Sequence, residues 1–364
     1  MKITDVQAHI LALPRQQDEL TSPWIWGDFS QVVVVVDTDE GITGYGEAFS
    51  YGVPQATASV VNQVLKPLLI GADPTHITAL LDQMYRQTHL FGRYGITTFA
   101  ISGVDIALWD IAGKCAGLPL YRLFGSGQVD SVPAYASLVR YSEIDHVRQA
   151  TARAKVEGYA AIKLHQIDAD SLDVAREVVG DDVHLMMDIN CAWTPEEALS
   201  MAQLFSPYEP LWLEEPLWPP EDFSGLARLG DLSGLAIATG ENACTVYQFR
   251  QMLDAGAATY IQPSVIKVGG ISEWRKVAAV AEPYNVSIMP HSPYFGPGLL
   301  ATAHLVAATP RAPMLEYLYV KLAASLFSTP LAVQEGSLSV PQGPGLGLDV
   351  DLDVLQRYRV QPSA

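Results

Sequence analysis

The sequence predicts an α/β protein, in which an α+β domain precedes a parallel β-barrel with helices outside, as in the (β/α)8 fold. After Gly127, short apolar runs alternate eight times with helical stretches, which is the pattern of such a barrel. The first 125 residues differ, with strand-like segments followed by helical ones. The chain has 364 residues, enough for two domains, and its 49% hydrophobic and 17% charged residues exclude a largely disordered protein.

The first 50 residues predict an antiparallel sheet. Apolar residues alternate with polar ones from Ile3 to Ile10, a valine-rich run covers Gln31–Asp37, and a third segment covers Gly41–Gly46. Turn residues around Asp39 join the last two segments into a hairpin. The glycines of the third segment lack the Lys-Ser/Thr of a phosphate-binding loop, so no nucleotide site is expected there.

Helices are predicted from Pro54 to Gly125. The clearest spans Thr98–Gly117, where apolar residues recur at three- and four-residue spacing, and it ends at a glycine followed by Pro119. The segment from Phe327 onward is rich in Gly, Pro and Asp and does not continue the strand–helix repeat. We expect it to return and pack on the first domain.

We therefore assign residues 1–125, completed by residues 327–364, to the α+β domain and residues 126–326 to the barrel. The eight expected barrel strands are Val132–Ala136, Ala160–Leu164, Val183–Met187, Leu211–Leu213, Leu235–Ala238, Tyr260–Ile261, Val286–Met289 and Met314–Leu315.

Polar residues follow seven of these runs, and those of successive strands lie 23 to 27 positions apart. Because reactive groups of such barrels lie at the carboxyl ends of the strands, this spacing places them on one rim. From the second strand to the eighth they are Lys163 with His165, Asp188, Glu214, Glu241, Ser264, His291 and Glu316.

Three of these residues predict a metal site. Asp188, Glu214 and Glu241 converge from neighbouring strands and would repel one another without a cation. Ligands that are all oxygen favour Mg²⁺ over zinc or copper. The alternative is that each carboxylate merely caps the helix that follows it.

Lys163 and His165 are two positions apart on a strand, so both point to the barrel mouth. Lys163 would hold a substrate carboxylate or stabilise an enolate, and His165 is a candidate base. His291 comes from the far side of the metal, so the two imidazoles would address opposite faces of one bound molecule. The alternative is that each histidine is structural.

The composition excludes several classes of partner. The 22 Lys and Arg against 40 Asp and Glu give a net charge of −18, which disfavours nucleic acid and anionic membranes. The N-terminus lacks the apolar stretch of a signal peptide, and neither Val32–Val36 nor Leu299–Ala308 predicts a membrane span. The three cysteines, Cys115, Cys191 and Cys244, suit a reducing compartment, so we expect a cytoplasmic protein.

Several segments carry a resemblance to a known family. They are Gly41–Glu47, Asp105–Asp110, Gly113 with Lys114, Ile162–His165, Met187–Asn190, Trp212–Pro216, Gly240–Asn242, Gly269–Ile271 and Leu315 with Glu316. With these segments the chain resembles the enolase superfamily, mandelate racemase subgroup, over essentially its whole length.

The resemblance implies an N-terminal α+β capping domain over a TIM-like (β/α)7β barrel. It implies one Mg²⁺ per subunit on the three carboxylates, and a homo-oligomer. It also implies that Glu316 hydrogen-bonds the substrate carboxylate or the enediolate, and that Asn190 belongs to the substrate site.

The sequence departs from the subgroup pattern in two places. His165 occupies the position of the second lysine of a Lys-x-Lys pair, and Ser264 replaces the aspartate that supports the seventh-strand histidine. A serine can orient His291 but cannot neutralise its charge, so His291 is expected to be a weaker base and a better acid. Lys267 resembles the sixth-strand lysine base of cycloisomerases, but strand parity with Ser264 predicts that it faces outward.

Substrate selection in this family resides in capping-domain loops. The matching segments are Thr21–Phe29, with Trp24 and Trp26, and Phe49–Val53, with Tyr51. The two indoles would form a lid that excludes water or would fill a domain interface. Arg93 and Tyr94 are further candidates for reaching a polar substrate.

These residues predict a Mg²⁺-dependent dehydratase of a small anionic substrate, a hydroxylated carboxylate such as an acid sugar. It would remove the α-proton to give an enediolate stabilised by metal and lysine, and expel the β-hydroxyl to give a 2-keto-3-deoxy acid. His165 is favoured as base and His291 as acid, with the roles exchangeable. The alternatives are a racemase or epimerase that uses both histidines as bases, and a non-catalytic metal-binding relative.

Overall fold

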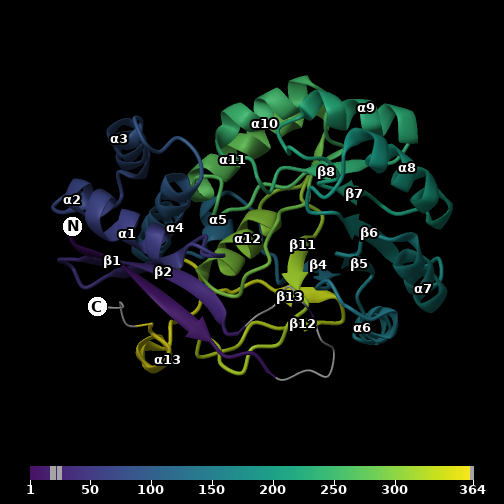
Figure 1. Cartoon of the computed structure of the whole chain (residues 1–364). Helices are drawn as coiled ribbons and strands as arrows, with labels where there is room; N and C mark the ends of the chain where they lie inside the picture. Colours follow the sequence, from purple (N-terminus) through teal and green to yellow (C-terminus); the bar gives the residue numbers. More distant parts are fainter. Residues whose placement is uncertain (17–21, 23–26, 361–364) are drawn as a thin grey trace.

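The computed structural model of the chain describes residues 1–16, 22 and 27–360. Figure 1 shows a small unit of sheet and helices, formed by the N-terminal part of the chain, beside a larger unit of alternating strands and helices.

The N-terminal unit contains a three-stranded antiparallel sheet, β1 (Ile3–Leu13), β2 (Phe29–Thr38) and β3 (Thr43–Ala48), in the order β1-β2-β3. The predicted hairpin is confirmed, because β2 pairs antiparallel with β3. Buried side chains of β2, among them Val32 and Val34, form one hydrophobic cluster with residues of the long helix α4 (Ile96–Ala116).

Glycines let this sheet approach α4 closely. A Cβ at Gly46 would lie 1.9 Å from the carbonyl oxygen of Gly103, and one at Gly44 would lie 2.2 Å from that of Ala107. The glycine-rich strand that could be mistaken for a phosphate loop therefore serves backbone packing. The remaining helical elements of this unit are α1 (Pro54–Ser59), η1 (Val60–Leu65), α2 (Lys66–Leu69), α3 (Ile77–Thr88) and α5 (Leu120–Leu123).

Helix α4 ends as the sequence predicts, at Gly117, whose φ of 65° is the left-handed conformation of a helix C-cap. Among the described residues it is the one helix with the length and hydropathy of a membrane span. Most of it is buried inside the protein, which is typical of a core helix.

The second unit contains eight parallel strands, and all eight expected strand positions are confirmed. Their order is β11-β4-β5-β6-β7-β8-β9-β10. They are β4 (Ser131–Ser137), β5 (Ala161–Leu164), β6 (His184–Asp188), β7 (Leu213–Glu214), β8 (Ile237–Thr239), β9 (Tyr260–Ile261), β10 (Ser287–Ile288) and β11 (Leu315–Leu318).

Helices separate these strands in sequence and surround them in space (Figure 1). They are α6 (Ile144–Val156), α7 (Ala169–Val179), α8 (Pro195–Phe205), η2 (Ser206–Tyr208), α9 (Phe223–Ser233), α10 (Thr245–Asp254), α11 (Gly270–Ala281), η3 (Glu282–Tyr284) and α12 (Pro297–Ala307).

The two ends of the strand order are linked by hydrogen bonds from loops. The Ile288 N–H donates to the carbonyl of Arg311, and the Ser292 hydroxyl donates to the carbonyl of Glu316 at 2.7 Å. The arrangement is consistent with the predicted TIM-like barrel beside an N-terminal domain.

The C-terminal segment contacts both units. Its hairpin, β12 (Val333–Gln334) and β13 (Ser337–Ser339), extends the large sheet, because β13 pairs antiparallel with β4. The following helix, α13 (Leu352–Arg357), brings Leu355 into a cluster with Leu11 and Val33 of the N-terminal sheet.

Candidate active site

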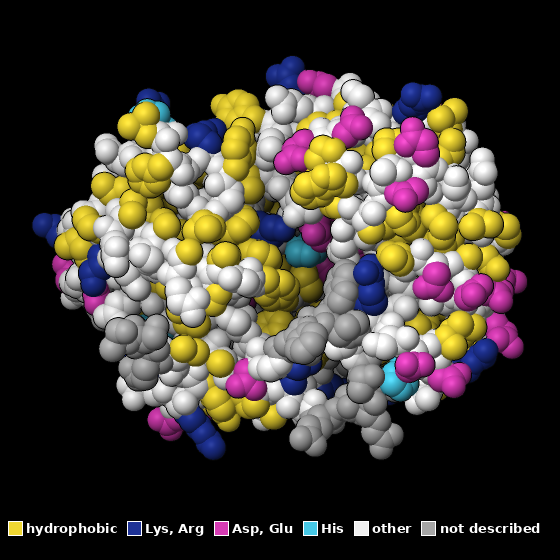
Figure 2. Space-filling model, viewed as in Figure 1, with side chains coloured by type: hydrophobic (Ala, Val, Ile, Leu, Met, Phe, Trp, Pro, Cys, Tyr) yellow, Lys and Arg dark blue, Asp and Glu magenta, His cyan; other side chains and the backbone are white. Residues whose placement is uncertain are grey.

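A cavity of about 620 Å³ lies between the two units, over the carboxyl ends of the parallel strands. Figure 2 shows a recess near the centre of the visible face, with a histidine and charged side chains inside it and hydrophobic side chains around it. Four of the polar residues expected at the strand ends line this cavity: His165, Glu241, His291 and Glu316.

The predicted carboxylate triad comes together below this cavity. Asp188 ends β6, Glu214 ends β7 and Glu241 follows β8, and each offers an oxygen within 4.8 Å of the others. Asp188 and Glu214 are buried, while the Glu241 side chain is 13% exposed. Three carboxylate oxygens at this separation form a hard, all-oxygen donor set of the kind that Mg²⁺ prefers.

The buried charges strongly perturb one another. Burial and the neighbouring Asp188 raise the pKa of Glu214 well above its usual range. Burial would also raise the pKa of Glu241, but the adjacent His291 outweighs this effect and lowers it to about 2. These opposed pKa shifts show that the carboxylates compete for the available positive charge, and a bound cation would balance their negative charges.

Lys163, on β5, is fully buried at the centre of this charge cluster. Its ammonium lies 2.6 Å from Glu214, 2.9 Å from Glu316 and 3.1 Å from Asp188. Burial alone would lower the pKa of Lys163, but the carboxylates raise it well above the usual value. The carboxylates therefore favour the charged form of Lys163.

His165 follows β5, and its side chain is 13% exposed. Its Nδ1 hydrogen-bonds the carbonyl oxygen of Leu138, an acceptor, so Nδ1 carries the proton. Its Nε2 lies 3.1 Å from Oδ2 of Asp188. The backbone contact thus directs the other ring nitrogen at the carboxylate triad.

His291 follows β10 and approaches the triad from another strand. Its Nε2 lies 3.0 Å from Oε2 of Glu241, and its buried Nδ1 has no hydrogen-bond partner among the described residues. Ser264 was expected to orient this ring. Its hydroxyl instead lies 3.5 Å from the hydroxyl of Tyr294, which donates to the carbonyl of His291 at 2.9 Å, so Ser264 reaches the histidine only through its backbone.

The predicted outward orientation of Lys267 is wrong. Lys267 lines the cavity, and its ammonium lies 4.8 Å from the centre of the Phe49 ring. The parity argument required an extended chain, but β9 ends at Ile261. The N–H groups of Lys267 and Val268 both donate to the carbonyl of Ser264, so the chain turns there and residues three apart share a side.

The other predicted substrate residues divide into three groups. Asn190 and Tyr51 line the cavity, and the Tyr51 hydroxyl donates to the carbonyl of Pro293. Arg93 and Tyr94 do not line it, because the Arg93 guanidinium lies over the ring of Tyr85 and Tyr94 is 51% exposed. Trp24 and Trp26 lie outside the described residues.

The sequence indicated only part of the apolar wall of the cavity, because Phe29 and Phe49 lie in the two capping-domain segments selected for substrate binding. The wall consists of Phe29, Phe49, Val139, Leu318 and Val320, with Asp28 and Ser30 at its edge. Strand parity offered a signal for two of these residues, because Leu318 and Val320 follow Glu316 at intervals of two.

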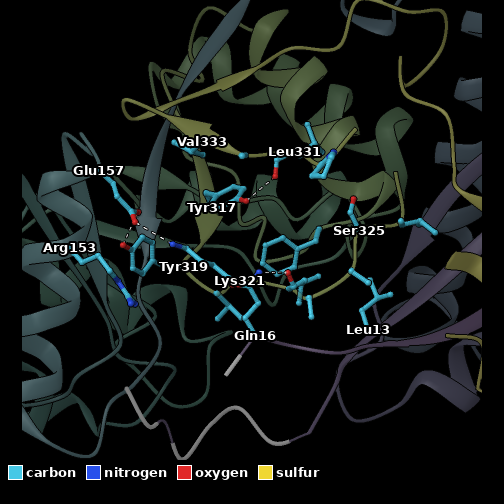
Figure 3. Close-up of a pocket in the computed structure, with 18 of the residues that line it drawn as sticks. Leu13, Gln16, Arg153, Glu157, Tyr317, Tyr319, Lys321, Ser325, Leu331 and Val333 are labelled. Atoms are coloured by element: carbon cyan, nitrogen blue, oxygen red, sulfur yellow. Dashed lines mark hydrogen bonds and ion pairs between the residues drawn. The ribbon is translucent and has the colours of Figure 1, made fainter. Parts of the chain in front are cut away.

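A second cavity, of about 570 Å³, lies beside the loop that follows β11 (Figure 3). Its charged groups contact one another: the Tyr319 hydroxyl donates to Glu157 at 2.8 Å, Lys321 lies 3.6 Å from Glu157, and the Arg153 guanidinium lies over the Tyr319 ring. None of the site residues selected from the sequence lines this second cavity among the residues that the structure describes.

Two parts of the chain match known protein families. Residues 25–125 match the family described as mandelate racemase / muconate lactonizing enzyme, N-terminal domain, and residues 145–354 match the enolase C-terminal domain-like family. The chain belongs to the enolase superfamily, mandelate racemase subgroup.

Members of this superfamily with related sequences are sugar-acid enzymes. The chain is 35% identical to a 3,6-anhydro-alpha-L-galactonate cycloisomerase of Streptomyces coelicolor over 92% of both chains. It is also 35% identical to an arabinonate dehydratase of Saccharolobus solfataricus over 90% of both chains. A solved structure of a racemase from Streptomyces coelicolor with bound magnesium has a TM-score of 0.87 and 33% identity, covering 98% of this chain and 100% of that one.

Proposed function

We propose that this enolase-superfamily enzyme is a Mg²⁺-dependent dehydratase of an acid sugar. The observation that carries the proposal is the placement of two histidines around one carboxylate triad. His165 and His291 come from different strands, and each directs Nε2 at a different member of the triad. Dehydratases of arabinonate, gluconate, xylonate and galactonate among its relatives support the substrate class.

The donor set fits the metal. Asp188, Glu214 and Glu241 would hold Mg²⁺, which supplies Lewis-acid polarisation of a substrate carboxylate and so acidifies the adjacent carbon. Lys163 contributes a fixed positive charge on the same side, where negative charge develops as the α-proton leaves.

His165 is the proposed base. Because its Nδ1 proton is held by the carbonyl of Leu138, neutral His165 has its lone pair on Nε2, which faces the site. It would take the α-proton of the substrate at Nε2.

His291 is the proposed acid. Its Nε2 approaches Glu241 from the other side of the triad, so a protonated ring can donate to an oxygen leaving the β-carbon. Within the described residues its Nδ1 has no hydrogen-bond partner, so no carboxylate orients the ring from that side. The products are water and an enol that tautomerises to a 2-keto-3-deoxy acid.

The same two groups would also serve a cycloisomerase, the second candidate. If the leaving oxygen is an ether oxygen of a bridged sugar acid, its expulsion opens the ring and the product is an isomer of the substrate. The apolar wall formed by Phe29, Phe49 and Leu318 favours this candidate, because the C–H face of a ring packs on such side chains. The cycloisomerase relative from Streptomyces coelicolor supports it as well.

The test is incubation with Mg²⁺ in D₂O against aldonates, aldarates and 3,6-anhydro-sugar acids, with ¹H NMR and a 2-keto-acid assay. A keto acid formed from an open-chain acid establishes the dehydratase, and one formed only from a bridged acid establishes the cycloisomerase. Exchange of the α-proton with the carbon skeleton and its hydroxyls intact would replace both with a racemase or epimerase.

A further inference from the structure

Lys267 lies in the active-site cavity and has no part in the steps proposed above. It is 6% exposed, and it is the one Lys or Arg among the described residues that line this cavity. Its ammonium faces the ring of Phe49 at 4.8 Å and donates to Oδ1 of Asn242 at 3.4 Å. Both contacts are to uncharged groups.

The two buried lysines of the site differ in the charge of the groups that they contact. Lys163 contacts three carboxylates within ion-pair distance, whereas Lys267 has none at that distance in the described part of the chain. Glu241 is close enough for Lys267 to help lower its pKa, but Glu241 would be engaged by the metal. A nearly buried ammonium without a counter-charge attracts an anion.

The position of Lys267 is fixed by the N-terminal unit. The Phe49 N–H donates to the carbonyl of Ile266, and the Gly269 N–H donates to the hydroxyl of Ser102 on α4 at 2.9 Å. The turn that carries Lys267 is thus held on both sides.

The residues that follow this turn, at the start of α11, are also held by hydrogen bonds to α4. Asp105 on α4 accepts hydrogen bonds from both the N–H and the hydroxyl of Ser272, at 2.9 and 2.6 Å. Gly270, with φ of +82°, fits only without a side chain, since a Cβ there would lie 2.4 Å from the Asp105 carboxylate. A lysine held in this way is preorganised to contact a ligand.

We propose that Lys267 determines substrate specificity by binding a second carboxylate of the substrate, beyond the one that the metal site takes. The preferred substrates are then dicarboxylic sugar acids rather than monocarboxylic ones. This inference rests on the proposed function for the location of the first carboxylate.

The test measures binding of compounds that cannot eliminate, in the Mg²⁺-loaded enzyme. The probes are 2-hydroxyglutarate and 2-hydroxyadipate, each compared with the monoacid that has a methyl group in place of the distal carboxylate. None of the four carries an oxygen β to a carboxylate, so their dissociation constants are independent of turnover. The binding test can therefore fail while the dehydratase assay succeeds, and the dehydratase assay can fail while the binding test succeeds.

The wild type is expected to bind at least one diacid about tenfold or more tightly than its monoacid, as for a charge-assisted hydrogen bond. Lys267→Met should abolish this preference and leave monoacid affinity within about twofold, while Lys267→Arg should retain part of it. The matched control is Lys276→Met, which removes an exposed lysine paired with Glu273 on α11 and should change neither affinity.

Two results would overturn the proposal. One is a wild type that binds neither diacid better than its monoacid. The other is a Lys267→Met variant, folded by circular dichroism, that keeps the wild-type preference or loses affinity equally for diacids and monoacids.

Discussion

Nε2 of His291 lies 3.0 Å from Oε2 of Glu241. The corresponding nitrogen of His165 lies 3.1 Å from Asp188, so the two imidazoles contact two different members of one carboxylate triad. This relationship allows one histidine to take a proton and the other to give one, and it makes their roles separable by mutation.

Replacing each histidine by asparagine should give different partial reactions. His165→Asn should lose both α-proton exchange in D₂O and keto-acid formation, by about 10²–10⁴-fold, because it removes the proposed base. His291→Asn should lose keto-acid formation by a similar factor but keep exchange, because proton removal does not need the acid. NMR of both reactions checks this, and the reverse pattern would exchange the assigned roles.

Ser264→Asp should change the pH dependence of the reaction. The Ser264 hydroxyl reaches His291 only through Tyr294, so a carboxylate in its place would act through its negative charge, which favours the protonated form of the His291 ring. The limb of the pH–rate profile that belongs to the acid should then move to higher pH by about one unit. Ser264→Asn is the neutral control, and an equal shift in both variants would contradict this explanation.

Mg²⁺ should stabilise the folded protein through the triad. Binding to the folded state alone contributes about 2.7 kcal/mol when the ion is at 100 times its dissociation constant, so Tm should rise with Mg²⁺ concentration. Glu241→Gln should require much more Mg²⁺ for the same rise. Glu177→Gln, which changes an exposed carboxylate paired with Arg148, should behave as the wild type. Chelation by EDTA should abolish catalysis.

Glu47 should make stability depend on pH. Glu47 is on β3, and its buried side chain accepts a hydrogen bond at 2.9 Å from the Gly298 N–H at the start of α12. Burial raises the pKa of Glu47 from 4.5 to about 7. Between these values the unfolded chain releases the proton that the folded protein retains, so the stability contributed by Glu47 falls as pH rises from about 4.5 to 7.

Glu47→Gln removes this titration. The free energy of unfolding of the wild type, relative to the variant, should therefore decrease between pH 5 and pH 8, by up to about 3 kcal/mol. Denaturant unfolding at both pH values measures the difference. The control Glu177→Gln should show no such change, and a difference between wild type and Glu47→Gln that is constant with pH would refute the prediction.

The expected strands and the carboxylate triad were predictable because both depend on local pattern and regular spacing. A parallel strand–helix repeat puts the carboxyl ends of all strands on one side, so Asp188, Glu214 and Glu241 had to converge once the repeat was recognised. Glycine and turn residues likewise located the β2–β3 hairpin and the end of α4, since their backbone preferences act over only a few residues.

The orientation of Lys267 was not predictable, because it depends on where β9 stops pairing and the chain turns. That point is decided by hydrogen bonds with distant residues, from the Phe49 N–H to the Ile266 carbonyl and from the Gly269 N–H to the Ser102 hydroxyl. The apolar wall of the cavity depends in the same way on how the two units meet, because Phe29 and Phe49 come from one unit and Leu318 and Val320 from the other. The sequence by itself thus determined which residues share the rim of the strands, since regular spacing is a local property. Only the tertiary structure decided which of them face the substrate, since side-chain direction in loops is set by packing between segments far apart in the chain.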